Sequence, residues 1–555
     1  MKLETLFEKF DQFADAPDAV AKMRELVLEL AIQGKLVAQS SDDEPAFKQL
    51  DRIAAKKSKA GRVARVKAGR AASSAPEETE THVPNGWEKA SLTELVTVLN
   101  GRAYSKDELL AAGTPVLRVG NLFTSKHWYY SDLQLEPDKY CDKGDLIFAW
   151  SASFGPFIWP GPKVIFHYHI WKLELHSEVD LSKGYLYWFL QNKTQEIKRA
   201  GHGVSMLHMT KEKMEKLEVM LPPLAEQKRI VAKVDELMAL CDRLEAQQQE
   251  RETRHAALAR ASLARFADAP TPANLPFLFH PSYAIPPADL RKSILTLAVQ
   301  GKLVPQNSND EPAEEILARI AATKLRLQKT GEIGKEKPVE PLQPESLPFE
   351  APESWQWAKL AELTELITKG SSPKWQGIAY VTESEGVLFI TSENVGNYIL
   401  RKLDDLKYVA KGFNEIEPRS ILKRGDILMN LVGASIGRTA VYDLHDGANI
   451  NQAVALIRLV RETAGVCPRF LLHYLNSPSA IDYMLSSRVV NAQPNISLTD
   501  AREFAVPFPP LAEQLRIVAK VDQLMALVDE LEKQLSASRA TAEKLMEAVV
   551  SELTT

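Results

Sequence analysis

Two copies of one sequence pattern follow each other along the chain of 555 residues, and this repeat limits the possible folds more than any other feature. PPLAEQKRIVAKVDELMALCDRLE at 222–245 matches PPLAEQLRIVAKVDQLMALVDELE at 509–532. AIQGKLVAQSSDDEPA at 31–46 likewise matches AVQGKLVPQNSNDEPA at 298–313. Matches of this length do not arise by chance, so the sequence predicts two halves that are built on one structural frame.

The order of the repeats predicts a closed arrangement. The start of the chain matches its middle, and the middle in turn matches the C-terminal helix, so the end of the sequence overlaps its own beginning. The simplest structure with this property is a pseudo-twofold circular repeat whose termini lie close together.

The two segments that begin with PPLAEQ are predicted to form long helices. Proline is favoured at the first turn of a helix, and the apolar residues that follow alternate in spacing between four and three, which is a heptad pattern. We expect the two helices to pair as an antiparallel coiled coil, with ordinary helix packing as the alternative. The predicted seam consists of Ile230, Val234, Leu237, Cys241, Leu244, Ile517, Val521, Leu524, Val528 and Leu531.

Between the repeated frames lie two divergent segments that are rich in predicted strands. Short apolar runs such as DLIFAWS at 145–151 and DILMNLV at 426–432 indicate strands, and amphipathic helices are expected near 184–199 and 469–486. The predicted fold class is therefore α+β, with two small β-rich domains joined by a long antiparallel coiled coil. The expected boundaries are an N-terminal helical frame at 1–83, domain 1 at 84–221, a central helical frame and linker at 222–351, domain 2 at 352–508 and a C-terminal coiled-coil helix at 509–555.

The composition is that of an ordinary globular protein, with 45% hydrophobic and 25% charged residues. Three distant cysteines permit neither a disulfide framework nor a multi-thiolate zinc site. A net charge of −5 argues against a general nucleic-acid binder but leaves sequence reading by local loops open. Since no secretory signal and no run of 18 apolar residues occurs, we expect a cytoplasmic protein with no membrane contact.

The sequence contains no motif that indicates a catalytic site. GASIGRTA at 433–440 resembles a phosphate-binding loop but lacks its spacing and its lysine. His167 and His169 lie in a strand-like run without an acidic or thiol partner at metal spacing, so a structural role is favoured over a metal site. The aromatic residues from Phe123 to Trp171 are interpreted as core, with base stacking as the alternative.

Several of these elements together resemble one protein family along essentially the whole chain. PPLAEQ before a heptad helix, QGKLV followed by DEPA, and the GSSP, ITSENV and GASIGRTAV elements of domain 2 are similar to the specificity subunit of type I restriction-modification systems. One departure from many relatives is the segment 1–83, which carries an extra copy of the QGKLV frame.

This resemblance implies a non-catalytic DNA-reading subunit. Two target-recognition domains would each read one half of a split site in double-stranded DNA, and two methyltransferase subunits and the restriction or motor subunits would dock on the frame. The resemblance implies no cofactor on this chain, because S-adenosylmethionine, ATP and Mg²⁺ are used by the partner subunits. A coiled-coil adaptor for other proteins and a self-contained DNA-modifying enzyme with unrecognised motifs are the alternatives.

Polar residues in loops beside the predicted strands are the candidate base-reading residues. Arginine distinguishes guanine, and asparagine or glutamine distinguishes adenine, through paired hydrogen bonds in the major groove. For each candidate, a solvated loop residue is the alternative. The candidates are Arg102, Tyr104, Ser105, Lys106, Arg118, Asn121, Ser151, Ser153 and His208 in domain 1, and Lys369, Ser371, Ser372, Lys374, Trp375, Ser392, Asn394, Ser435, Arg438, Asn451, Gln452, Gln493 and Asn495 in domain 2.

Overall fold

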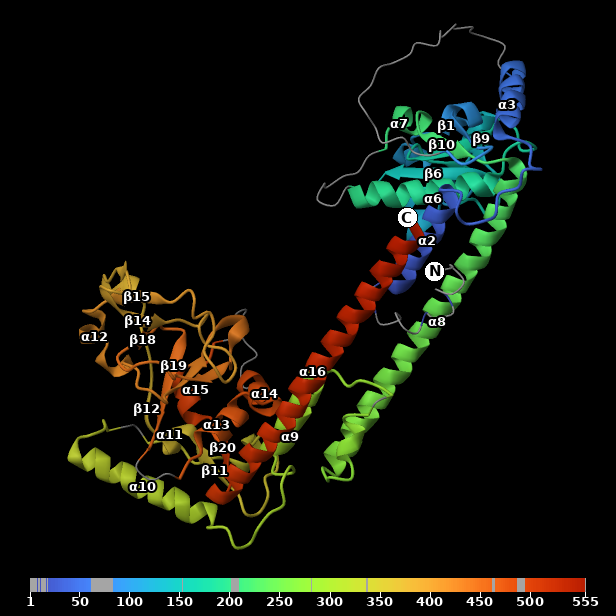
Figure 1. Cartoon of the computed structure of the whole chain (residues 1–555). Coiled ribbons are helices and arrows are strands. Elements are labelled where there is room, and N and C mark those ends of the chain that lie inside the picture. Colours follow the sequence, from blue (N-terminus) through green and yellow to red (C-terminus); the bar gives the residue numbers. More distant parts are fainter. Residues whose placement is uncertain are drawn as a thin grey trace. The chain divides into compact units, whose positions relative to one another are not determined.

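The computed structural model of the chain contains two compact units, whose elements are labelled in Figure 1. Unit 1 combines Met1–Arg251 with Ala537–Thr555, and unit 2 is Glu252–Ser536. Both ends of the chain therefore belong to one unit, as the circular repeat predicts. The structure describes residues 7, 10, 16, 18–60, 83–151, 153–200, 209–280, 282–335, 338–461, 465–486 and 495–554.

Each unit contains the same set of frame helices. A pair of shorter helices precedes each β-rich domain, and a long helix of 45 or 44 residues begins directly after it. None of the described helices is both long enough and apolar enough to cross a membrane. The frame helices are α2 (Ala19–Ile32), α3 (Ala46–Ala60) and α8 (Leu224–Asp268), and their counterparts are α9 (Pro287–Val299), α10 (Ala313–Thr330) and α16 (Leu511–Thr554).

The described residues of domain 1 form three sheets. A two-stranded sheet pairs β1 with β10, one four-stranded sheet has the order β2-β9-β6-β7, and the other has the order β4-β3-β8-β5 with β3 and β8 parallel. The strands are β1 (Glu88–Ser91), β2 (Val96–Asn100), β3 (Thr114–Leu117), β4 (Tyr129–Ser131), β5 (Tyr140–Cys141), β6 (Leu146–Ser151), β7 (Ser153–Ile158), β8 (Val164–Phe166), β9 (Ile170–Leu175) and β10 (Glu218–Leu221). Its helices are α4 (Leu92–Leu95), α5 (Val119–Phe123), α6 (Lys183–Ala200) and α7 (Lys211–Glu215).

Domain 2 repeats this topology but differs at both edges of one four-stranded sheet, because its described residues hold no counterpart of β5, the edge strand that pairs with β8 in domain 1. The order β12-β19-β16-β17 matches β2-β9-β6-β7, and the parallel pair of β14 and β18 matches β3 and β8, but here the extra edge strand β13 pairs with β15. The strands are β11 (Gln356–Lys359), β12 (Thr364–Lys369), β13 (Tyr380–Val381), β14 (Gly386–Ile390), β15 (Lys407–Ala410), β16 (Ile427–Asn430), β17 (Thr439–Val441), β18 (Asn449–Ile450), β19 (Val454–Leu459) and β20 (Ala505–Phe508). Its helices are α11 (Leu360–Leu363), α12 (Phe413–Ile416), α13 (Pro468–Leu475), α14 (Pro478–Ser486) and α15 (Leu498–Glu503). The predicted α+β class, with two sheet-rich domains and long helices, is confirmed.

The helix expected near 469–486 is wrong as a single element, because it is divided into α13 and α14. Pro478 has no backbone N–H and begins the second helix. At the break, the side chain of Asn476 bonds to both backbone groups of Thr439, with distances of 3.3 Å from the Thr439 nitrogen and 2.9 Å to its oxygen. Asn476, at the break between the two helices, therefore connects the end of α13 to β17.

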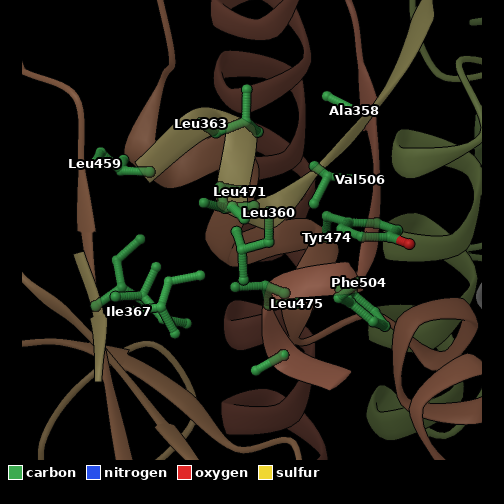
Figure 2. Close-up of a cluster of buried hydrophobic side chains, with 14 of the residues drawn as sticks. Ala358, Leu360, Leu363, Ile367, Leu459, Leu471, Tyr474, Leu475, Phe504 and Val506 are labelled. Carbon is green, nitrogen blue, oxygen red and sulfur yellow. The ribbon is translucent and has the colours of Figure 1, made fainter. Parts of the chain in front are cut away.

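The core of domain 2 lies where its first strands meet α11, α13 and α15 (Figure 2). Leu360 and Leu363 from α11 face Leu471 and Tyr474 from α13, and all four side chains are buried. Burial of a leucine side chain contributes roughly 1.5–3 kcal/mol. The apolar run at 426–432 contributes to this cluster through Ile427 and to a second buried cluster of domain 2 through Leu428.

The predicted seam residues are buried or half-buried, and they pack against several neighbours within each unit. In unit 1, Ile230, Val234 and Leu237 join the core of domain 1, while Cys241 and Leu244 join α2 and the end of α16. In unit 2, Ile517, Val521, Leu524, Val528 and Leu531 join α9 and the end of α8. The seam residues of each long helix therefore pack against three neighbours: a shorter frame helix, a β-rich domain and a segment of the second long helix.

Candidate nucleic-acid interface

The frame residues form the same ion pairs in both units. Three arginines of one frame form four ion pairs, and their three counterparts in the other frame form the same four pairs with the matching acids. The duplicated pairs, with nitrogen–oxygen distances of 2.5–2.7 Å, are Arg24–Asp242 and Arg291–Asp529, Arg24–Glu245 and Arg291–Glu532, Arg52–Glu44 and Arg319–Glu311, and Arg229–Asp43 and Arg516–Asp310. The repeat is thus one of contacts as well as of sequence.

The glutamine of PPLAEQ connects each long helix to a β-rich domain. Gln227 accepts a hydrogen bond from the Ser182 backbone nitrogen at 2.9 Å and donates to the Pro222 carbonyl oxygen at 2.9 Å. Gln514 accepts from the Cys467 backbone nitrogen at 2.8 Å and donates to the equivalent proline, at 2.9 Å. Both glutamines are fully buried. We call each pair of bonds the glutamine contact.

The glutamate of PPLAEQ is buried beside a tryptophan in both units. Trp87 Nε1 donates to Glu226 at 3.1 Å, and Trp355 Nε1 donates to Glu513 at 3.0 Å. Burial raises the pKa of both glutamates, because a charge is poorly solvated there. In the described structure, one carboxylate oxygen of each glutamate is buried without a hydrogen-bond partner.

We expect Glu226→Gln to make the thermal stability of unit 1 less dependent on pH. With a raised pKa, the folded state holds the proton more tightly than the unfolded state, so the native chain loses stability as the pH rises above the ordinary range of a glutamate. Glutamine keeps an acceptor for Trp87 and cannot ionise. The midpoint of thermal unfolding is measured for both chains at a series of pH values. As the pH rises, the midpoint of the native chain should fall relative to that of the variant. A constant difference contradicts the assignment, and Glu513→Gln is the matched variant in unit 2.

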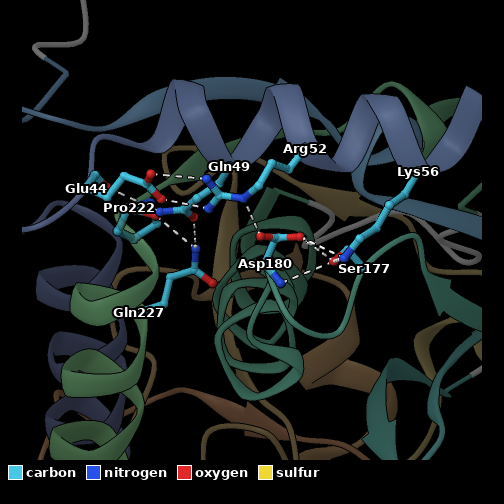
Figure 3. A network of polar contacts seen from close by, with 8 residues as sticks. All are labelled: Glu44, Gln49, Arg52, Lys56, Ser177, Asp180, Pro222 and Gln227. Carbon is cyan, nitrogen blue, oxygen red and sulfur yellow. Dashed lines mark hydrogen bonds and ion pairs between the residues drawn. The ribbon is translucent and has the colours of Figure 1, made fainter.

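A second polar network fastens α3 to the turn that precedes α6 (Figure 3). Asp180 accepts from Arg52 at 2.6 Å and from Lys56 at 3.0 Å, and Ser177 donates to it at 2.7 Å. Burial alone would raise the pKa of Asp180, but these three hydrogen bonds lower it to about 2. The frame of unit 1 is therefore joined to domain 1 at both the glutamine contact and this network.

The first candidate loop begins at an equivalent glycine in both domains. A Cβ on Gly101 would lie 2.3 Å from the His167 carbonyl oxygen, and one on Gly370 would lie 1.7 Å from the carbonyl oxygen of Ile450. Only glycine permits these approaches. The loop that carries Arg102 therefore begins beside the turn after β8, and the loop that carries Ser371 begins beside the end of β18.

The asparagine that follows the parallel strand has a structural role in both domains. Asn121 Oδ1 accepts from the Arg118 backbone nitrogen at 3.1 Å, and Asn394 Oδ1 accepts from the Thr391 backbone nitrogen at 3.0 Å. Asn394 is only 3% exposed, so its amide lies inside domain 2, and base reading by this residue stays a prediction. Asn121 also donates to the His127 carbonyl oxygen at 2.8 Å, which leaves its amide less able to reach DNA.

Arg102, Tyr104 and Arg118 of the domain 1 candidates also have contacts within the chain. Arg102 forms a paired ion contact with Glu108, at 2.6 and 3.0 Å, and its guanidinium lies 5.3 Å from the ring centre of Tyr104. Burial raises the pKa of Tyr104 to about 12, and its hydroxyl is buried without a partner in the described structure. Arg118 is exposed, with its guanidinium 5.1 Å from the ring centre of Tyr129.

The remaining candidates differ in exposure. Trp375 is the most open of them, with 76% of its surface exposed. Ser105, Lys106, Lys369, Lys374 and Asn495 are also exposed, and Ser151, Ser371, Ser372, Ser392, Ser435, Arg438, Asn451 and Gln452 are half-buried. His208, Gln493 and the side chain of Ser153 lie outside the described residues.

Two loops of domain 2 converge at the end of β16. The Asn430 backbone nitrogen donates to the Arg438 carbonyl oxygen at 3.0 Å, and the Asn430 side chain donates to the Ser392 carbonyl oxygen at 2.9 Å. Asn495 forms a backbone bridge with Val432 just beyond the same strand. The structure thus brings Ser392, Arg438 and Asn495, which are far apart in sequence, to one end of the sheet.

The interpretation of the domain 1 aromatic residues as core is correct only in part. Phe148, Phe166 and Trp171 are buried, whereas Phe123 and Tyr168 are 40% and 41% exposed. The run VIFHYHIWKLEL forms two strands, β8 and β9, separated by a turn at His167–His169. In the described part of the chain, no three His, Cys, Asp or Glu side chains are placed to hold a metal ion.

Comparison with known proteins places the chain in a family. The model described as "Type I restriction modification DNA specificity domain" matches residues 84–252 and 352–538, which include both β-rich domains and the start of each long helix. These segments make up more than half of the chain, and the chain therefore belongs to the family of type I restriction-modification specificity proteins. The resemblance inferred from the sequence is confirmed.

Individual relatives are similar along nearly the whole chain. The type I restriction enzyme EcoAI specificity subunit of Escherichia coli is 28% identical, over 96% of this chain and 93% of the relative. The type I restriction enzyme EcoEI specificity subunit of Escherichia coli is also 28% identical, over 96% of this chain and 93% of the relative. Among solved structures, the HsdS subunit from Thermoanaerobacter tengcongensis is 19% identical, with a TM-score of 0.42, and the match covers 86% of this chain and 98% of that one.

Proposed function

We propose that this chain is the DNA-specificity subunit of a type I restriction-modification complex, in which each β-rich domain reads one half of a split DNA site. The observation that carries the proposal is the contrast between frame and loops. The frame repeats its ion pairs and glutamine contacts one for one, whereas the loops that follow the same strands carry different polar residues. Family membership supports the same conclusion.

A duplicated frame suits a partner that binds twice. Two equivalent surfaces, one on each unit, can each accept one copy of the same subunit. In the proposed complex these copies are methyltransferase subunits, and the restriction or motor subunits join the same assembly. The partners hold S-adenosylmethionine, ATP and Mg²⁺ and perform methyl transfer and DNA cleavage, while this chain supplies sequence recognition.

Divergent loops suit two different half-sites. Base edges in the major groove are distinguished by a few well-placed side chains, and each correct paired contact is worth about 1–3 kcal/mol of discrimination. Exposed lysines and arginines beside them, such as Lys106 and Arg118 in domain 1 and Lys369 and Lys374 in domain 2, are suited to phosphate contacts.

Exchange of one domain tests the proposal. Replacing residues 84–221 with the matching segment of a relative of different specificity should change only one half of the methylated sequence. Sequencing of methylated bases in a host that carries the complete system measures this directly, and exchange of 352–508 is the reciprocal experiment. A change in both halves after a single exchange contradicts independent reading by the two domains.

The two alternative functions require other results. A self-contained enzyme requires methyl transfer or DNA cleavage by the isolated chain, and a protein adaptor requires an assembled complex that protects no specific sequence. Neither alternative is supported by the family match.

A further inference from the structure

One turn of domain 1 occupies the same structural position as one turn of domain 2. Turn 1 is His167–His169, between β8 and β9, and turn 2 is Asn451–Ala453, between β18 and β19. Both follow the second strand of a parallel pair. The matching backbone hydrogen bonds, donor first, are His167–Leu117 (2.9 Å) and Asn451–Ile390 (3.0 Å), Ile170–His167 (2.9 Å) and Val454–Asn451 (3.3 Å), and Trp150–His169 (3.1 Å) and Leu431–Ala453 (2.9 Å).

The two turns share their backbone but differ in chemistry. Turn 1 carries His-Tyr-His, and turn 2 carries Asn-Gln-Ala. A position whose backbone is preserved while its polar side chains change is suited to setting specificity, because the side chains can be replaced without moving the scaffold. Asn451 and Gln452 have the amide groups that recognise adenine. By structural equivalence, His167 and Tyr168 occupy the corresponding places in domain 1.

Turn 1 is held firmly from both sides. The Tyr168 backbone nitrogen donates to the Arg102 carbonyl oxygen at 3.0 Å, and the Trp150 indole nitrogen donates to the Tyr168 carbonyl oxygen at 2.9 Å. The ring centres of Tyr168 and His169 are 3.9 Å apart, and those of Tyr168 and His167 are 4.4 Å apart. A rigid turn loses little conformational freedom on binding, which favours precise contact with a ligand.

The side chains of turn 1 can donate and accept hydrogen bonds at neutral pH. Tyr168 is 41% exposed, so part of this residue is accessible from outside the domain. Burial, together with the nearby His169 and Arg118, lowers the pKa of His167 to about 4, which leaves the imidazole neutral. Its Nδ1 accepts from the His169 backbone nitrogen at 3.5 Å, so Nε2 carries the proton and is the donor. The exposed Arg118 lies close enough to influence His167 and supplies positive charge beside the turn.

We propose that turn 1 contacts the bases of the DNA half-site read by domain 1, with Tyr168 as its main specificity-determining residue and turn 2 in the same role in domain 2. This inference rests on the proposed function. The tyrosine ring can contact the methyl group of thymine, and its hydroxyl can bond to a base edge, whereas the amides of turn 2 favour adenine. Different chemistry at one structural position would let similar domains read different sequences.

Variants of turn 1 in the assembled complex test the inference. Binding is measured to the native DNA site and to sites with single base changes in either half. Tyr168→Ala should reduce discrimination at one or more positions of one half-site by roughly 5- to 150-fold, as loss of a good base contact does. Discrimination in the other half should be unchanged. Gln452→Ala should show the reverse pattern, and Val179→Ala, at a 75% exposed position in domain 1, is the matched surface control.

A second variant guards against misfolding. Tyr168→Gln gives turn 1 the polar residue of turn 2 and should change the preferred base while thermal stability stays near that of the native chain. Unchanged discrimination in both halves for Tyr168→Ala and Tyr168→Gln overturns the inference, even if the native complex recognises a split site. If the native complex recognises no split site at all, the proposed function itself is wrong.

Discussion

Replacement of Asp426 by alanine is expected to destabilise unit 2 by about 3–5 kcal/mol, the cost of leaving a buried charge without its partner. Asp426 is fully buried at the start of β16 and accepts two hydrogen bonds from Arg458, at 2.8 and 2.6 Å. It also accepts from Arg461 at 3.1 Å and from the Lys423 backbone nitrogen at 2.7 Å. Alanine removes all four interactions, and Arg458, which is only 8% exposed, cannot reach water without local rearrangement.

Denaturant unfolding of the native chain and the variant measures this loss. Domain 1 offers a matched comparison, because its KGDLIF at 143–148 echoes RGDILM at 424–429, so that Asp145 corresponds to Asp426. Asp145 pairs with Lys172 at 2.8 Å, but their side chains are 24% and 14% exposed. Water can solvate this pair in part, so Asp145→Ala should cost less than Asp426→Ala. Equal, small losses of stability in the two variants would show that the buried Asp426–Arg458 ion pair does not stabilise unit 2 in this way.

Leu524→Ala is expected to cost about 2–5 kcal/mol, because it removes a fully buried side chain and leaves a cavity. Leu524 lies in α16 within the cluster that joins this helix to α9. Leu237→Ala is the matched change in α8, where the leucine is 3% exposed and packs with the core of domain 1. Both variants should lower the midpoint of thermal unfolding.

Leu527 supplies the control for the seam. It lies in the same helix as Leu524, is 44% exposed and should tolerate alanine within about 0.5 kcal/mol. If Leu527→Ala and Leu524→Ala had equal effects, the heptad assignment of α16 would be incorrect. Helix propensity cannot produce the expected difference, because both substitutions replace leucine with alanine in one helix.

The frame was predictable because its signals are periodic and duplicated. The heptad spacing identified Ile230 and Ile517 as apolar positions that would be buried, and the PPLAEQ motif marked where α8 and α16 begin. The echoed motifs at 143–148 and 424–429 also fall on equivalent strands, β6 and β16. Each of these features depends on short-range pattern, which a sequence displays directly.

The candidate interface was less predictable because its residues depend on distant partners. Asn394 looked like a base-reading residue, but it caps the backbone at Thr391, and a capping asparagine cannot be told from a DNA-binding one by its neighbours in sequence. The turn at Tyr168 was hidden in an apolar run and becomes evident only through its bonds with Arg102 and Trp150. Its equivalence to turn 2 requires the sheet topology.

The glutamine contacts bear on how new specificities can arise. Gln227 and Gln514 bond to backbone nitrogens, of a serine in one unit and a cysteine in the other, and not to side chains. Every residue except proline offers this donor, so the glutamine contact places almost no demand on the residue at that position of the incoming segment. A recognition domain received by recombination would therefore keep this contact whatever residue it carries there, and side-chain attachments such as the Asp180 network would set the limits of exchange.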